Sequence, residues 1–72
     1  MQHDFHGHNI AESVQIAEDI LFKVRENLSE QIWEFITGAG VIQNRLVLWC
    51  IENDLEYHIY PNNLGIIKVF IE

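Results

Sequence analysis

Near the amino end of the sequence, apolar residues recur with the spacing of a helix. The steps between them are 4, 3, 4, 3 and 4 residues, through Ile10, Val14, Ala17, Leu21, Val24 and Leu28. A stripe of this kind predicts an amphipathic helix. Asn9 is suited to cap it, and Glu12 places a carboxylate in the first turn, where the helix dipole favours negative charge. We therefore expect a helix that begins near Ile10.

Segments with strand character surround this helix. The residues before it are few enough for one short strand, and aromatic and β-branched residues or alternating patterns mark three more strands. Helical spacing returns once, after a glycine-rich break. The expected order is strand Gln2–His6, helix Ile10–Leu28, strand Gln31–Ile36, helix Ile42–Asn53, strand Leu55–Tyr60, turn Pro61–Gly65 and strand Ile67–Ile71.

This order predicts an α/β (α+β) two-layer sandwich, β-α-β-α-β-β, with two helices on a mixed four-stranded sheet. A strand, a helix and a second strand favour a parallel pair joined by a right-handed crossover, and the last two strands should be antiparallel. The length of 72 residues predicts one domain, residues 1–72. A core this small gives limited stability, so a homodimer is left open.

Composition excludes several classes of protein. The formal net charge of −7 lacks the basic surplus that usually drives binding to nucleic acid or anionic lipid, so any nucleic-acid site must rest on local features. One cysteine, Cys50, cannot form an internal disulfide and is expected to be a small buried thiol rather than a nucleophile. No stretch is long and apolar enough to span a membrane. We expect a cytoplasmic protein.

Two loops should meet where the parallel strands end, the usual place for a ligand crevice in such folds. In Asp4-Phe5-His6-Gly7, residues two apart share a face, so the Asp4 carboxylate and the His6 imidazole should converge. In Thr37-Gly38-Ala39-Gly40, glycines permit close backbone approach, and the next helix offers free amides to an anion. Together these loops would place an acid/base pair beside a phosphate cradle.

The two loops resemble those of the small MutS-related (Smr) domain family. That family has a Leu-Asp-Leu-His-Gly-like stretch before its first helix and a Thr-Gly-x-Gly or His-Gly-x-Gly loop before its second. Asp4–Gly7 and Thr37–Gly40 match both motifs in order, spacing and position. Further agreement comes from Glu12, Ile36, Trp49 and Gly65, so that the resemblance covers Asp4 to Ile71.

The resemblance implies binding of DNA or RNA, with nicking or cleavage in some family members and use of a divalent metal such as Mg²⁺ or Mn²⁺ in some. It implies nuclease chemistry for Asp4 and His6, where Asp4 could hold a metal or orient water and His6 could act as a base or donor. The residues expected to contact nucleic acid or phosphate are Gly7, Thr37, Gly38, Ala39, Gly40 and Arg45.

Departures from the family pattern leave other functions open. His3 replaces an apolar residue, Ala39 replaces a frequent basic residue, and the uncharged run Val41–Asn44 leaves Arg45 as the cation nearest the expected crevice. Binding to nucleic acid should therefore be weak. The alternatives are a catalytically degenerate protein-interaction module and a binder of a small phosphorylated ligand.

Three residue groups carry secondary hypotheses. The histidines at positions 3, 6 and 8, with Asp4, could bind zinc, although no closing ligand is evident. Exposed aromatic side chains could stack on bases, although such residues more often fill a core. Acidic residues could form a solvated face or attract a basic protein partner. The aromatic set is Trp33, Phe35, Tyr57, Tyr60 and Phe70, and the acidic set is Glu26, Glu30 and Glu34.

Overall fold

The computed structural model describes residues 1–72 and has the predicted order of elements. The elements are β1 (Gln2–Asp4), α1 (Ile10–Glu26), β2 (Gln31–Ile36), α2 (Val41–Glu52), β3 (Glu56–Tyr60) and β4 (Asn63–Ile71). Their order along the chain confirms the α/β (α+β) expectation of two helices and four strands. Neither helix is long and apolar enough to cross a membrane.

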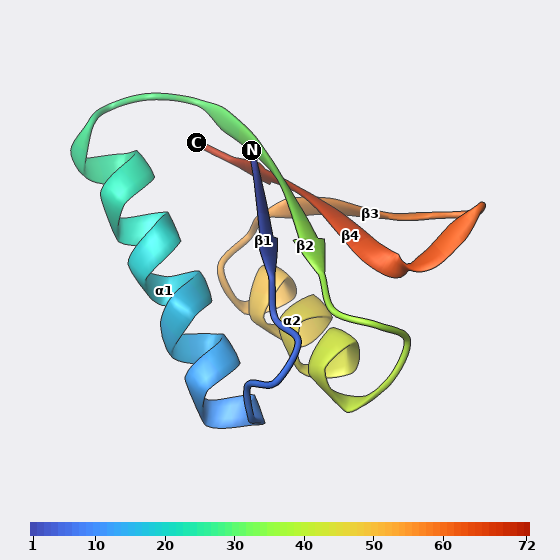
Figure 1. Ribbon diagram of the computed structural model, residues 1–72. Helices are drawn as coiled ribbons and strands as arrows, with labels where there is room; N and C mark the ends of the chain where they lie inside the picture. Colours follow the sequence, from blue (N-terminus) through green and yellow to red (C-terminus); the bar gives the residue numbers. More distant parts are fainter.

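The strands form one mixed sheet in the order β1-β2-β4-β3 (Figure 1). β1 and β2 are parallel, and β4 is antiparallel to both of its neighbours, β2 and β3. These directions confirm the predicted crossover pair and the predicted terminal hairpin. The chain pattern did not predict that β4 would insert between β2 and β3, which makes it a central strand and leaves β1 and β3 at the edges.

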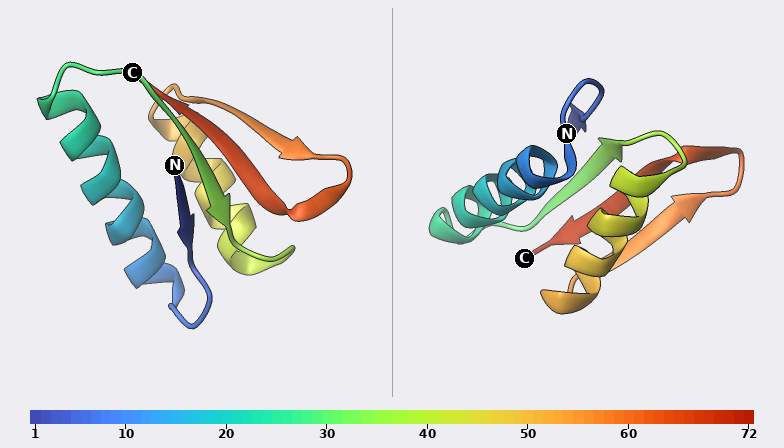
Figure 2. Two further views of the ribbon diagram at one scale, coloured as in Figure 1. Left: turned by 45° about the horizontal axis from the view of Figure 1, so that its top comes forward. Right: turned by 90° about the horizontal axis from the view of Figure 1, so that it is seen from below.

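Both helices cover the same face of the sheet, and the opposite face has no covering layer (Figure 2). Along β4, side chains alternate between the two faces of the sheet. Ile67, Val69 and Ile71 point into the helix layer and are almost completely buried. The two-layer sandwich is therefore confirmed. Its core consists of Phe5, Ala17, Leu21, Val24, Phe35, Leu46, Trp49, Cys50, Leu55, Ile67, Val69 and Ile71.

The aromatic side chains divide between the two faces of the sheet. Phe35 is fully buried, and Trp33 and Tyr57 pack against the core. Tyr60 lies on the open face, where its hydroxyl donates a 2.7 Å hydrogen bond to Oε2 of Glu34. That hydrogen bond raises the pKa of Tyr60 above its usual range. Thus three of the five aromatic residues serve the core, and Glu34 is a bonded strand residue rather than a freely solvated acid.

Cys50 lies in the core, as expected. Its side chain has no exposed area, and burial raises the pKa of the thiol to about 12. A thiol that is neutral and inaccessible is not a nucleophile.

Element ends differ from the expectations by two or more residues at three places. β1 ends at Asp4 rather than His6, because the backbone N–H of His6 turns back to the Asp4 side chain. α1 ends at Glu26 and is followed by Asn27, whose N–H donates to the carbonyl of Lys23. β4 begins at Asn63, so the turn after Tyr60 is much tighter than the predicted Pro61–Gly65.

Candidate functional site

Two loops leave the sheet at the same edge. Asp4 is the register partner of Ile36, so the parallel strands β1 and β2 end side by side (Figure 1). The N–H of Phe5 continues the pairing by donating to the carbonyl of Ile36 at 2.9 Å. The segments that follow, Asp4–Asn9 and Thr37–Gly40, therefore start from adjacent points, as the sequence motifs predicted.

The first loop is held by one buried ring and exposes its polar side chains. Phe5 is buried and packs edge-on against Phe35, with ring centroids 5.0 Å apart. The Oδ1 atom of Asp4 accepts a 2.8 Å hydrogen bond from the N–H of His6, and Gly7 adopts a positive φ of 83° that favours glycine. Asp4 and His6 are both exposed. Their side chains share the loop, but no hydrogen bond joins the carboxylate to the imidazole.

The first loop ends at Asn9, which caps α1 through two reciprocal hydrogen bonds. The Asn9 side chain accepts a 2.8 Å hydrogen bond from the N–H of Glu12, and the Glu12 carboxylate accepts one of 3.0 Å from the N–H of Asn9. This reciprocal pair is a capping box. The capping box therefore occupies two amides at the amino end of α1 and places a negative side chain there.

The second loop is fastened to the start of β4. The carbonyl of Gly65 accepts hydrogen bonds from the N–H groups of Thr37 and Gly38, at 2.9 and 3.1 Å. The Thr37 hydroxyl donates to the carbonyl of Gly38 at 2.8 Å. Gly38 has a positive φ of 69°, and a Cβ on Gly65 would lie 3.2 Å from the Gly38 Cα. These contacts occupy the Gly38 amide, whereas the amides of Ala39 and Gly40 have no partner in the protein.

The amino end of α2 differs from that of α1 because no side chain caps it. Gly40 occupies the capping position without a side-chain hydrogen bond, and the first turn contains no acidic residue. The side chain of Gln43, in that turn, points inward and donates to the carbonyl of Leu64. The amides that begin α2 are thus available to an anion, at the end of the helix where the dipole is positive.

Arg45 does not reach this helix end. Its Nη1 atom lies 3.2 Å from Oε1 of Glu52, which is two turns further along α2. The side chain is therefore directed toward the carboxyl end of the helix. Because both partners are partly exposed, the ion pair is weak and Arg45 can exchange it for another anion.

The histidines do not form a metal centre. His3 points toward the helix layer, where its ring meets the edge of Phe5 at 4.8 Å, and its Nε2 is buried without a hydrogen-bond partner. The His8 ring lies 6.5 Å from the His3 ring. No group of three or more His, Cys, Asp or Glu side chains is placed to hold a metal ion. The zinc hypothesis has no support in this geometry.

The surface between the two loops is open. None of the three hollows in the protein surface is lined by Asp4, His6 or residues 37–40. A small ligand would be poorly enclosed here, because small-molecule sites are concave. An extended ligand could lie across both loops.

The sequence motifs did not predict which contacts hold the second loop in place. The carbonyl of Gly65 accepts from two amides of this loop, and the carbonyl of Leu64 accepts from the side chain of Gln43 in the helix that follows. A glycine just before a strand is a signal of close backbone approach, but its partner, Gly38, lies far away in the sequence. Gln43 belongs to the buried stripe Gln43-Leu46-Trp49-Cys50, where a polar residue indicates an internal hydrogen bond.

The fold of the whole chain is similar to that of a solved domain. A scan against protein-family models finds no match, and a search of curated proteins finds none. A search of solved structures finds similarity to the crystal structure of a human small-MutS related domain. The two chains share 22% sequence identity with a TM-score of 0.76, over 99% of this chain and 100% of the other.

Proposed function

We propose, from the premise that this chain has the fold of a small MutS-related domain, that it binds nucleic acid across the loop edge of β1 and β2. The phosphate backbone would lie against the amino end of α2 and the loop Thr37–Gly40. Asp4, His6 and Gly7 would lie beside it on the neighbouring loop. This assignment follows the resemblance of both motifs to the Smr domain family.

The observation that carries the proposal is the uncapped start of α2. Backbone amides at a helix start bind phosphate when no side chain competes for them. The amides of Ala39 and Gly40 have no partner in the protein, and the first turn of α2 has no acidic residue. Neighbouring Gly38, at a positive φ, brings the backbone of this loop to the surface without a side chain.

The charge of the protein sets the expected strength of binding. A chain with a formal charge of −7 can neutralise few phosphates, and its long-range field repels a polyanion. We expect weak binding, with about one to three counterions released and a slope of about −0.9 per phosphate on duplex DNA. The contacts would consist of backbone amides and, once it leaves Glu52, Arg45.

Binding can be measured by fluorescence anisotropy with labelled single- and double-stranded DNA and RNA of one sequence, at several salt concentrations. The expected result is weak, salt-dependent binding to at least one of the four. Inorganic phosphate and a nucleoside triphosphate serve as competitors. Binding of the nucleotide alone, with no binding of any polymer, would replace this proposal with a site for a small phosphorylated ligand.

We extend the proposal to cleavage of the bound strand, with Asp4 and His6 as the catalytic residues. Asp4 uses Oδ1 to accept the His6 N–H, which leaves its other oxygen free at the surface. The His6 ring has no hydrogen bond within the protein and is free to act as a general base or donor to a phosphate oxygen. A divalent ion such as Mg²⁺ or Mn²⁺ would neutralise charge on the scissile phosphate, and Asp4 is the carboxylate that would hold it.

Asp4→Asn separates cleavage from binding. Asparagine can still accept the His6 N–H, so the loop should keep its shape, but the negative charge is lost. Cleavage in the presence of Mg²⁺ or Mn²⁺ should fall at least a hundredfold, while affinity for nucleic acid stays within severalfold. Product formation on a gel measures cleavage, and fluorescence anisotropy measures affinity. Unchanged cleavage in Asp4→Asn would leave Asp4 with a structural role in the turn.

A further inference from the structure

The face of the sheet opposite the helices is uncovered along its whole length (Figure 2). Because strand residues alternate, this face carries the side chains that do not enter the core. From β2, β4 and β3 they are Ile32, Glu34, Ile36, Ile66, Lys68, Phe70, Glu56, His58 and Tyr60. The side chain of Ile32 is 49% exposed. This face is therefore partly apolar and free to contact another molecule.

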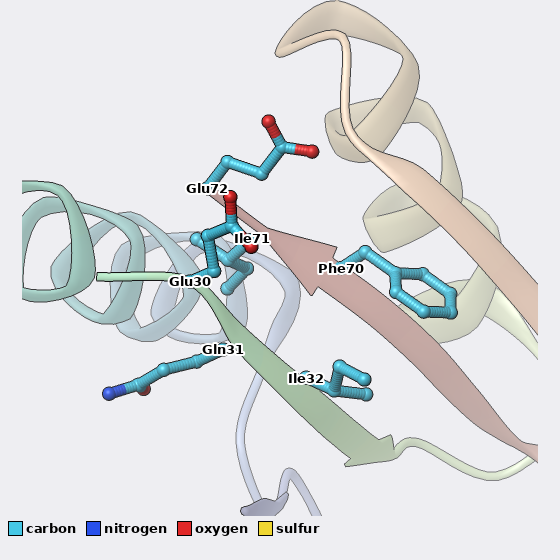
Figure 3. Close-up of a pocket in the computed structure, with 6 residues that line it drawn as sticks. All are labelled: Glu30, Gln31, Ile32, Phe70, Ile71 and Glu72. Carbon is cyan, nitrogen blue, oxygen red and sulfur yellow. The ribbon is translucent and has the colours of Figure 1, made fainter. Parts of the chain in front are cut away.

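A hollow of about 240 Å³ lies at one end of this face, where β2 begins and β4 ends (Figure 3). Its lining residues are Glu30, Gln31, Ile32, Phe70, Ile71 and Glu72. Ile32 and Phe70 are register partners and supply its apolar part. This hollow is small and suits one large side chain rather than a typical small-molecule ligand.

The hollow is edged by two unneutralised acids. Gln31 pairs with Ile71, so Glu30 and Glu72 stand at adjacent strand ends, where Figure 3 draws them together. Neither carboxylate takes part in an ion pair or a hydrogen bond. Arg25 reaches the backbone carbonyl of Glu72 and leaves the side chain free.

The ring of Phe70 already faces a cation of its own chain. The Nζ atom of Lys68 lies 5.4 Å from its centroid, and Glu56 is its register partner on β3. Because Lys68 occupies one face of this ring, Phe70 offers a ligand apolar contact. The negative charge at the hollow comes from Glu30 and Glu72. Charge and shape thus agree at this end of the sheet.

We propose that this hollow docks a basic segment of a partner protein, with an apolar side chain against Ile32 and Phe70 and flanking lysine or arginine residues beside Glu30 and Glu72. A second copy of the chain is disfavoured, because it would bring its own acids against the same carboxylates. The surface is separate from the proposed nucleic-acid edge. It lies at the opposite end of β2, about 16 Å away at ~3.3 Å per residue.

The test uses the ¹⁵N-labelled protein and a capped pentapeptide, Lys-Leu-Lys-Leu-Lys, followed by chemical-shift changes in amide spectra. Two matched peptides replace the lysines by glutamates or the leucines by serines. We expect saturable shifts centred on Glu30, Ile32 and Phe70 with the first peptide, and weak or no shifts with the other two. Shifts centred on the helices or on residues 37–40 would overturn the proposal, as would equal binding of the serine peptide.

Variants separate a specific site from general attraction to an acidic protein. Glu30→Gln and Asp19→Asn each remove one exposed negative charge, but Asp19 lies on α1, away from the hollow. Glu30→Gln should weaken peptide binding about threefold to fivefold, the upper part of the range for one exposed ion pair. Asp19→Asn should leave it unchanged. Ile32→Ser should weaken it further.

Equal losses in Glu30→Gln and Asp19→Asn would reduce the effect to net charge and refute the site. Shifts at Ile32 and Phe70 that grow with protein concentration in the absence of peptide would assign the face to a second copy instead. Each result is independent of nucleic-acid binding, so either proposal can fail while the other holds.

Discussion

The two helices start from the same edge of the sheet, yet their amino ends are completed differently. At the start of α1, Asn9 and Glu12 exchange two hydrogen bonds that occupy two backbone amides and add a carboxylate. Before α2, Gly40 has no side chain to offer, and no acid follows it. One helix start is thus stabilised by a cap, whereas the other keeps unpaired amides. The loop beside the uncapped start is hydrogen-bonded to the carbonyl of Gly65.

This difference separates stability from ligand binding. A capping box contributes to folding and repels anions, so the start of α1 is unsuited to phosphate. The start of α2 gives up that stabilisation and keeps unpaired donors at the positive end of the helix dipole. Adding a cap to α2 should therefore weaken phosphate binding, and removing the cap of α1 should lower the stability of the protein.

The largest effect is expected when a cap is added to α2. Gly40 has an extended backbone, with φ near 173°, and a Cβ there meets nothing within 4 Å, so Gly40→Asp should fold normally. Its carboxylate would take up the free amides and repel phosphate. Affinity for nucleic acid should fall tenfold or more, equivalent to about 1.4 kcal/mol, while the melting temperature stays equal or rises.

Gly40→Ser is the matched control, because it adds a cap without a charge and should weaken binding less than Gly40→Asp. Anisotropy titrations and thermal melts provide both readouts. Full affinity in Gly40→Asp would show that α2 does not contact the phosphate.

The reverse change removes the cap of α1. Asn9→Ala deletes the side chain that accepts from Glu12 and should lower the free energy of unfolding by about 1 kcal/mol. For a domain of this size that corresponds to a fall in Tm of about 4 to 8 °C. Nucleic-acid affinity should not change. Asn9→Ser, which can still cap, should melt close to the parent protein, and a similar fall in both variants would rule out the cap as the cause.

A smaller effect is expected from the cation nearest to the open end. Arg45→Ala should flatten the dependence of log K on log salt by about 0.9, the value for one phosphate on duplex DNA. Lys23→Ala removes the same charge from α1 and should leave the slope unchanged. Equal slopes in Arg45→Ala and the parent protein would mean that Arg45 stays with Glu52 during binding.

Local patterns predicted much of this fold. The stripe from Ile10 to Val24 and the pair Asn9 and Glu12 depend on neighbours within one or two turns, so the first helix and its cap were readable from the sequence. The parallel pair β1 and β2 followed from the order strand, helix, strand, which favours a right-handed crossover between parallel strands. The position of β4 between β2 and β3 was not readable, because a hairpin can add to a sheet by either strand and local patterns do not distinguish the two.

The candidate site was predictable in outline. The motifs placed Asp4 and Thr37 at one edge because both follow parallel strands. The occupied amide of Gly38 and the direction of Arg45 depend on Gly65 and Glu52, contacts that no short motif encodes. Contacts between residues far apart in the sequence therefore account for the difference between the predicted and the observed geometry of these loops.

The single thiol in the core provides a built-in reporter of transient opening. Cys50 is fully buried and its pKa is about 12, so a thiol reagent added at neutral pH reacts with molecules whose core has opened and not with closed ones. The labelling rate, divided by that of an unfolded peptide of the same local sequence, gives the open fraction under native conditions. Differences between helix-cap variants can then be measured in water without denaturant.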